Sequence, residues 1–279
     1  MSYRTLLTVI HQSASCKAQV SKASQLARKL DAHLDILCLG IDEVQVGYYF
    51  AGADAVLQQT SIAMAREKAE ALQALAEEQA QAEAIRWSAT TLVTQFGVLT
   101  DVVARAAMFA DLVVLPLPQG DHGGDEAVAI IEAALFSGQS AVLLLPDAEL
   151  PTEFPRRAVI GWNSGMEAMT AVRAALPALK MAGSASVAMV EPPARSLTQT
   201  GPGEALSTML DRHGIKAEIS LLVKTKPRVS DVLMEHVQDQ QADLLVAGAY
   251  GHSRFREAIL GGATRELIAK AKVPLLMAH

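Results

Sequence analysis

A short sequence that occurs twice is the feature that most constrains the fold of this chain. Ala-Asp-Leu-Val-Val at 110–114 returns as Ala-Asp-Leu-Leu-Val at 242–246, at the same place in two similar series of segments. In each series, short continuous apolar runs alternate with longer segments whose apolar residues have helical spacing. Strands that alternate with helices pair in parallel through right-handed crossovers. The sequence therefore predicts an internal duplication of one doubly wound α/β unit.

The length of the chain and one proline-rich stretch predict where the two copies meet. A chain of 279 residues is comfortable for two domains. The segment 146–155 contains three prolines and acidic residues, as linkers do. We predict domains over 1–147 and 156–279, each a five-stranded parallel sheet with helices on both faces. The expected strands are 6–10, 34–39, 85–93, 112–115 and 141–145, and then 159–162, 186–190, 217–223, 244–247 and 273–277.

Short polar side chains mark the expected helix starts. A serine or threonine hydroxyl can accept a hydrogen bond from an unpaired N–H group of the first helical turn. Ser13 or Ser15, Thr100 and Ser230 each stand before a segment of helical periodicity. We therefore expect these residues to be N-caps.

Composition and charge favour a soluble, cytoplasmic protein and disfavour two classes of partner. The formal net charge of -6 gives no electrostatic reason to bind nucleic acid or an anionic membrane surface. No stretch approaches the ~18 consecutive apolar residues of a membrane span, and residues 1–9 lack the apolar core of a signal peptide. Cys16 and Cys38 belong to no metal-binding pattern. We expect two buried or idle thiols.

Spaced glycines follow the fourth expected strand of the second half. Gly248 and Gly251 come where the strand ends, and Gly261 and Gly262 stand just before the next helix. Glycine lets the backbone turn and lets a ligand approach closely. Unpaired N–H groups and the positive end of the helix dipole favour phosphate at a helix start. Glycine pairs also occur in ordinary strand-to-helix turns, so the pair alone leaves both interpretations open.

With the repeat and the strand order, the spacing Gly248, two residues, Gly251, nine residues, Gly261 resembles that of tandem universal stress proteins, over essentially the whole chain. The resemblance implies that both halves have a Rossmann-like fold of the adenine nucleotide alpha hydrolase type. It also implies binding of ATP, or of AMP or ADP, with or without Mg²⁺, and a regulatory role in a stress response instead of enzymatic turnover. The binding residues that it implies are Asn163, Val190, Gly248, Gly251, His252, Ser253, Gly261, Gly262, Ala263 and Thr264.

Two departures from the family pattern fall inside this set. Gly262 stands where the family prefers Ser or Thr, and Thr264 is expected to supply the hydroxyl instead. Asn163 replaces an Asp that reaches the adenosine, which removes a charge but keeps an acceptor and adds a donor. We expect both changes to weaken nucleotide binding without abolishing it.

The first half departs from the glycine pattern completely. Pro116 and Gln119 stand where the second half has Gly248 and Gly251, and by the same spacing Ala129 and Ile130 replace the glycine pair. Proline offers no N–H group, and we expect Ile130 to crowd the helix start. We therefore predict that the first half binds no nucleotide. The family's usual pairing through last strands implies an intrachain pseudo-dimer, with 141–145 beside 273–277; further homodimerisation and the identity of a protein partner stay open.

Other chemistry has weaker support in the sequence. The neighbours His252 and Ser253 suggest a base and a nucleophile, but adjacent side chains usually point apart, and they equally suit a phosphate loop or a solvated loop. The sequence has no Walker Lys motif, so we expect ATP hydrolysis to be weak or absent. No Gly-x-Gly-x-x-Gly motif follows either first strand, which disfavours a dinucleotide oxidoreductase. A nucleotide-free scaffold is the remaining alternative, with Tyr48, Tyr49 and Phe50 either docking a partner or packing within the fold.

Overall fold

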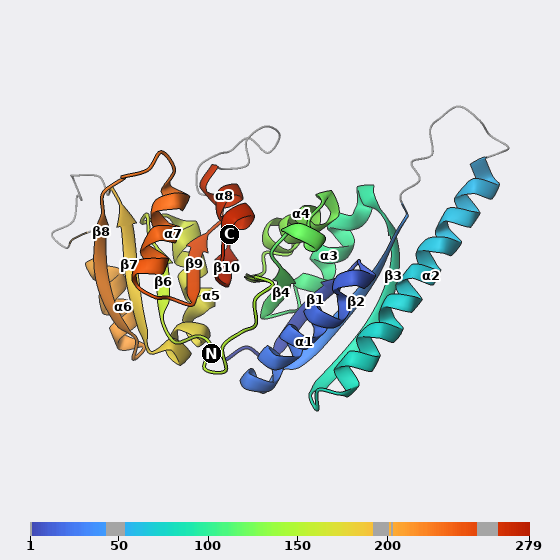
Figure 1. Cartoon of the computed structure of the whole chain (residues 1–279), viewed down its shortest axis with the longest axis horizontal. Coiled ribbons are helices and arrows are strands. Elements are labelled where there is room, and N and C mark those ends of the chain that lie inside the picture. The colour runs from blue at the N-terminus through green and yellow to red at the C-terminus, as the bar shows by residue number, and fades with distance from the viewer. Residues whose placement is uncertain (1, 43–53, 192–200, 202, 250–261) are drawn as a thin grey trace. The chain divides into compact units, whose positions relative to one another are not determined.

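A computed structural model describes residues 2–42, 54–191, 201, 203–249 and 262–279. These residues form two compact units, Ser2–Ser140 and Ala141–His279 (Figure 1). Two groups of residues singled out from the sequence lie outside the described residues. They are the aromatic run Tyr48, Tyr49 and Phe50, and the loop residues Gly251, His252, Ser253 and Gly261.

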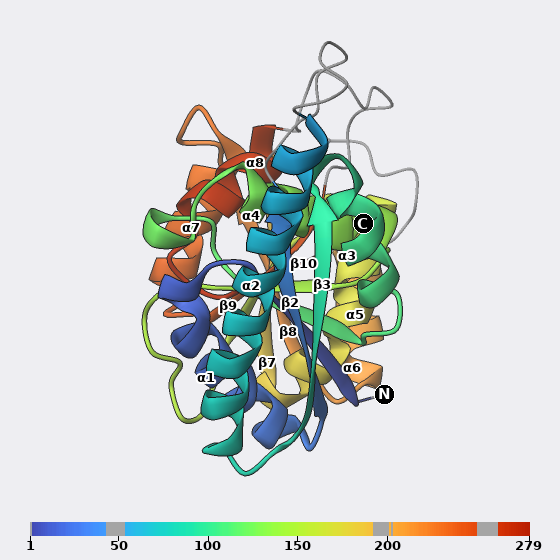
Figure 2. The same ribbon diagram turned by 90° about the vertical axis from the view of Figure 1, so that its right-hand side faces the viewer.

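The unit Ser2–Ser140 is a parallel sheet in the strand order β3-β2-β1-β4, covered by helices. The long helix α2 packs against β2 and β3 (Figure 1, Figure 2). The strands β1, β2 and β4 are apolar and buried along most of their length, as expected of parallel strands that are covered on both faces. The elements are β1 (Thr5–Ile10), α1 (Ser13–Leu30), β2 (His33–Asp42), α2 (Asp54–Gln81), β3 (Arg86–Gln95), α3 (Leu99–Ala107), β4 (Leu112–Pro116) and α4 (Asp125–Glu132), with a π-helical turn at Ala133–Ser137.

The unit Ala141–His279 has the strand order β5-β10-β9-β6-β7-β8. All neighbouring strands are parallel except β5, which lies antiparallel to β10. The expected pairing of 141–145 with 273–277 is therefore present, and β5 belongs to the sheet of this unit. The elements are β5 (Val142–Leu145), β6 (Ala158–Gly161), α5 (Met166–Ala182), β7 (Ser184–Val190), α6 (Glu204–Arg212), β8 (Lys216–Leu222), α7 (Val229–Asp239), β9 (Leu244–Gly248), α8 (Gly262–Lys270) and β10 (Leu275–Ala278).

The winding of the second sheet reverses at β6. This strand has β9 on one side and β7 on the other, so the crossovers that leave it run in opposite directions. Loops at the carboxyl ends of two such strands diverge and leave a crevice, which is where doubly wound sheets bind ligands. The sequence predicted this position, between the first and fourth strands of the second half.

The predicted N-caps are wrong. Ser13, Thr100 and Ser230 lie inside their helices, whose N-cap residues are Gln12, Val98 and Arg228. None of these three N-caps makes a side-chain hydrogen bond to its helix. A cap needs a non-helical backbone as well as a hydroxyl. The N-cap of the helix lies one residue before Ser13 and two residues before Thr100 and Ser230.

The repeated aspartates tie together two strands within each unit. The carboxylate of Asp111 accepts the N–H groups of residues 4 and 5 at 2.7 and 2.9 Å. Asp243 accepts the N–H groups of residues 156 and 157 at 2.9 and 3.0 Å. Each aspartate thus joins the start of the fourth strand of a repeat to the start of its first. These contacts give the repeated aspartate a structural role in each unit.

Both cysteines are buried and unpaired. Burial raises the pKa of Cys16 to about 11 and that of Cys38 to about 12. At neutral pH both groups are therefore protonated, and a thiol is a poor nucleophile. The helices of the described residues include none that combines the length and apolar character needed to cross a membrane.

Candidate functional site

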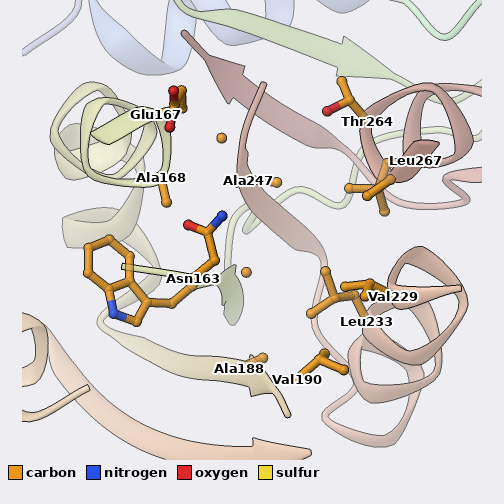
Figure 3. Close-up of a pocket in the computed structure, with 14 residues that line it drawn as sticks. Asn163, Glu167, Ala168, Ala188, Val190, Val229, Leu233, Ala247, Thr264 and Leu267 are labelled. Carbon is orange, nitrogen blue, oxygen red and sulfur yellow. The ribbon is translucent and has the colours of Figure 1, made fainter. Parts of the chain in front are cut away.

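A cavity of about 290 Å³ lies at the switch point of the second unit. Its walls are the carboxyl ends of β6, β7 and β9 and the first turns of α5, α7 and α8 (Figure 3). One part of the lining is apolar and comprises Ala188, Val190, Val229, Leu233 and Leu267. The polar side chains are Asn163, Glu167 and Thr264, and Trp162 adds an indole ring. An apolar cavity with a few polar groups is the usual form of a small-molecule site.

The structure brings five of the predicted binding residues together. Asn163, Val190, Gly248, Ala263 and Thr264 all line the cavity. Gly262 is the first residue of α8 and does not line it. The remaining members of the predicted set lie outside the described residues.

Asn163 follows β6, and its side chain is directed into the cavity (Figure 3). Its Oδ1 accepts the N–H group of Gly165 at 2.9 Å, across Ser164, whose φ of 62° is left-handed. Asparagine favours such turns because its short side chain can hydrogen-bond the backbone two residues on. Within the described part of the chain, its Nδ2 makes no hydrogen bond. The amide group of Asn163 therefore has a donor left for a ligand.

Gly248 is required by packing. A Cβ atom on this residue would lie 2.5 Å from the backbone nitrogen of Ala168 and 2.6 Å from the carbonyl carbon of Glu167. Both atoms belong to the first turn of α5, which crosses directly over the end of β9. The sequence explained this glycine by a turn and by ligand approach; the structure adds that no side chain fits between β9 and α5.

The start of α8 forms the wall of the cavity opposite the strand ends. Ala263 and Thr264 lie in its first turn, at the end of the helix where the dipole favours negative charge. Thr264 is buried, with 5% of its surface exposed. A Cβ atom at Gly262 would meet nothing within 4 Å. The described residues therefore leave space for a Ser or Thr side chain at this position, although the chain has glycine there.

Sequence reasoning missed Glu167, Leu233 and Leu267. These residues line the cavity because the helix turns that carry them lie at the edge of the sheet. Hydrophobic periodicity predicts the buried face of a helix but not which of its turns lies at that edge. A signal was present for Glu167, since the first turn of the helix after β6 must lie at the switch point.

At the equivalent position of the first unit, a histidine and a glutamate lie close together. His11 follows β1 as Asn163 follows β6, and its Nε2 lies 3.9 Å from the carboxylate of Glu126. Glu126 and Asp125 occupy the first turn of α4, where they disfavour an anion. Ala129 and Ile130 lie well inside α4, so the expected crowding of the helix start by Ile130 is wrong. Fewer residues separate β4 from α4 than separate β9 from α8. Counting the same number of residues from each strand therefore reaches the interior of α4 but the start of α8.

His11 should make the stability of the first unit depend on pH. Burial, followed by the charges of Lys68 and His122, lowers its pKa from 6.5 to about 4. The unfolded chain therefore takes up the proton first, and the stability contributed by neutral His11 is complete above pH 6.5 and is lost as the pH falls towards 4. We expect a loss of about 2 kcal/mol between pH 6.5 and pH 5, at 1.36 kcal/mol per unit.

Urea unfolding at several pH values measures this effect. His11→Gln should remove that part of the pH dependence, whereas His213→Gln, at an exposed position, should retain it. An unchanged pH dependence in His11→Gln would contradict the assignment.

The fold and the cavity define a protein of two doubly wound α/β units, the second of which carries a ligand-sized cavity at its switch point. Comparison with known proteins identifies the family of this second unit. The model of the universal stress protein family matches residues 167–279. Residues 167–279 of the C-terminal unit are therefore assigned to a universal stress protein domain.

Individual relatives agree with this assignment. Universal stress protein Slr1230 of Synechocystis sp. is 34% identical over 68 residues, which is 24% of this chain and 23% of that protein. A universal stress protein structure from Archaeoglobus fulgidus covers 100% of this chain and 96% of its own, with a TM-score of 0.73 at 14% identity. A putative universal stress protein from Pseudomonas aeruginosa covers 99% and 93%, with a TM-score of 0.58 at 15% identity. The two structural likenesses show the fold, which both units of this chain share.

Proposed function

We propose that the C-terminal unit binds an adenine nucleotide, ATP or its products ADP and AMP, and that the chain acts as a regulatory protein without enzymatic turnover. The observation that carries this proposal is the cavity. An apolar lining, a free amide donor and the start of a helix meet at one switch point. The match of residues 167–279, which include most of the cavity lining, to the universal stress protein family supports it.

The three parts of a nucleotide find complementary surroundings along this cavity. The flat base suits the apolar part around Ala188, Val190 and Leu233. The phosphates suit the N–H groups at the start of α8, where the helix dipole favours negative charge. Gly251 and Gly261 complete this anion site in the proposal. Mg²⁺, where present, would be held mainly by phosphate oxygens, as it usually is in nucleotide sites.

Titration of the full chain with ATP, ADP and AMP tests the proposal. We expect saturable binding with a dissociation constant near micromolar, which corresponds to about 8 kcal/mol. Val229 lines the cavity but is 36% exposed, so Val229→Phe should fill the cavity without disturbing the core. We expect this variant to bind at least tenfold more weakly with unchanged urea unfolding, because the ring occupies the space of the base.

Val223→Phe is the matched control, because this valine is 72% exposed and does not line the cavity. It should bind as the unmodified protein does. Absence of saturable binding below about millimolar ATP, or equal binding by Val229→Phe, Gly251→Val and the control, would remove the proposal.

A further inference from the structure

Glu167 is a carboxylate in the cavity wall to which the proposed function gives no role. It lies in the first turn of α5 and lines the cavity, on a different wall from Thr264 (Figure 3). Within the part of the chain that the structure describes, it makes no hydrogen bond or ion pair. A carboxylate accepts hydrogen bonds through two oxygens and donates none when ionised. This cavity therefore presents an acceptor that a ligand can use.

The side-chain oxygens of Glu167 and Asn163 lie close to the same residue, Gly165. A Cβ atom on Gly165 would lie 2.9 Å from Oδ1 of Asn163 and 3.1 Å from Oε2 of Glu167, so both oxygens lie beside this glycine. The Asn163 oxygen already accepts the N–H group of Gly165. Glu167 is left as the acceptor and the Nδ2 group of Asn163 as the donor. Together they suit a group that both donates and accepts hydrogen bonds, as a hydroxyl does.

The position of Glu167 decides which part of a nucleotide it meets. The first turn of α5 lines the same cavity as Ala188, Leu233 and the start of α8. With the base held against Ala188 and Leu233 and the phosphates at the start of α8, the sugar would lie along the wall that α5 contributes. Phosphate groups would be repelled by the carboxylate at this point. Ribose hydroxyl groups would donate to it, in hydrogen bonds that are strengthened by the charge.

We infer that Glu167 is a specificity-determining residue that selects nucleotides with free ribose 2′- and 3′-hydroxyl groups. It disfavours nucleotides whose 3′ oxygen is phosphorylated or cyclised, because they place a negative charge beside the carboxylate. This inference rests on the proposed function and goes beyond it, since it names the sugar that the site reads.

Calorimetric titration of the full chain with ATP, 2′-deoxyATP, 3′-deoxyATP and 3′,5′-cyclic AMP tests the inference, in EDTA and again in Mg²⁺. We expect the unmodified protein to prefer ATP to each deoxynucleotide by about tenfold, as for one hydrogen bond to a charged group. Glu167→Ala should reduce each preference to about twofold or less and should strengthen cyclic AMP binding relative to ATP. Glu204→Gln, in the first turn of α6 and outside the cavity, should keep the preferences of the unmodified protein.

The outcomes separate this inference from the proposed function. Saturable ATP binding with the same preferences in the unmodified protein and Glu167→Ala overturns the inference alone. Tighter ATP binding by Glu167→Gln with unchanged preferences overturns it too, since the carboxylate would then only repel phosphates. A preference that exists only in Mg²⁺ overturns it by pointing to a bridging ion. No binding of any adenine nucleotide removes the proposed function and this inference together.

Discussion

Gly248→Ala is expected to lower the free energy of unfolding of the C-terminal unit by about 3 kcal/mol and to weaken ATP binding at least tenfold. The added Cβ would lie 2.5 Å from the backbone of α5. Because the contact is with backbone, no rotamer change relieves it, and α5 must move away from β9 at the cost that overpacking usually brings. The same movement would displace Glu167 and Asn163 from the cavity wall. Urea unfolding followed by circular dichroism, together with ATP titration, measures both effects.

Gly262→Ala is the matched control for this prediction. It lies in the same strand–loop–helix segment, yet its Cβ would meet no described atom within 4 Å. At the start of a helix, alanine should change stability by less than about 1 kcal/mol, and in the favourable direction. If Gly248→Ala unfolded at the same urea concentration as Gly262→Ala, the packing explanation of Gly248 would be wrong.

Asp243→Ala is expected to destabilise the same unit by about 3 kcal/mol. Its carboxylate accepts backbone N–H groups from residues 156 and 157, and its side chain is only 14% exposed. Removal leaves these N–H groups without their partner beside a buried strand, and lost hydrogen bonds to a charged group carry the largest penalties. Asp243→Asn keeps one acceptor oxygen and should cost less than half as much. Thermal or urea unfolding of the full chain measures the difference.

Asp111→Ala provides the internal comparison, because Asp111 holds residues 4 and 5 in the same way. We expect a similar loss in the first unit, with nucleotide binding unchanged in Asp111→Ala. Full stability of Asp243→Ala combined with lost ATP binding would show instead that Asp243 acts on the ligand.

The strands and the location of the cavity could be predicted from sequence because both follow from strong local signals. Continuous apolar runs fixed β1, β4 and β9 to within one residue at each end, and alternation of strands with helices implied where the winding reverses. Asn163 and Gly248 reach the cavity simply because each follows a strand that ends at the switch point.

Features that depend on packing between elements could not be predicted in this way. The helix starts differ because backbone geometry, and not the hydroxyl alone, decides where a cap forms. The packing role of Gly248 depends on α5, which is distant in sequence. Glu167 has no ion-pair partner among the described residues, and this depends on which side chains the fold brings to the cavity wall.

The antiparallel pairing of β5 with β10 means that the sequence repeat and the compact unit have different boundaries along the chain. The repeat assigns Val142–Leu145 to the first copy, whereas the sheet that this strand completes belongs to the second. Cutting the gene at the linker would remove β5 from one side of β10 and leave an open row of N–H and C=O groups there, which invites pairing with another chain. A gene fragment meant to encode the C-terminal unit by itself has to include the codons for residues 141–145.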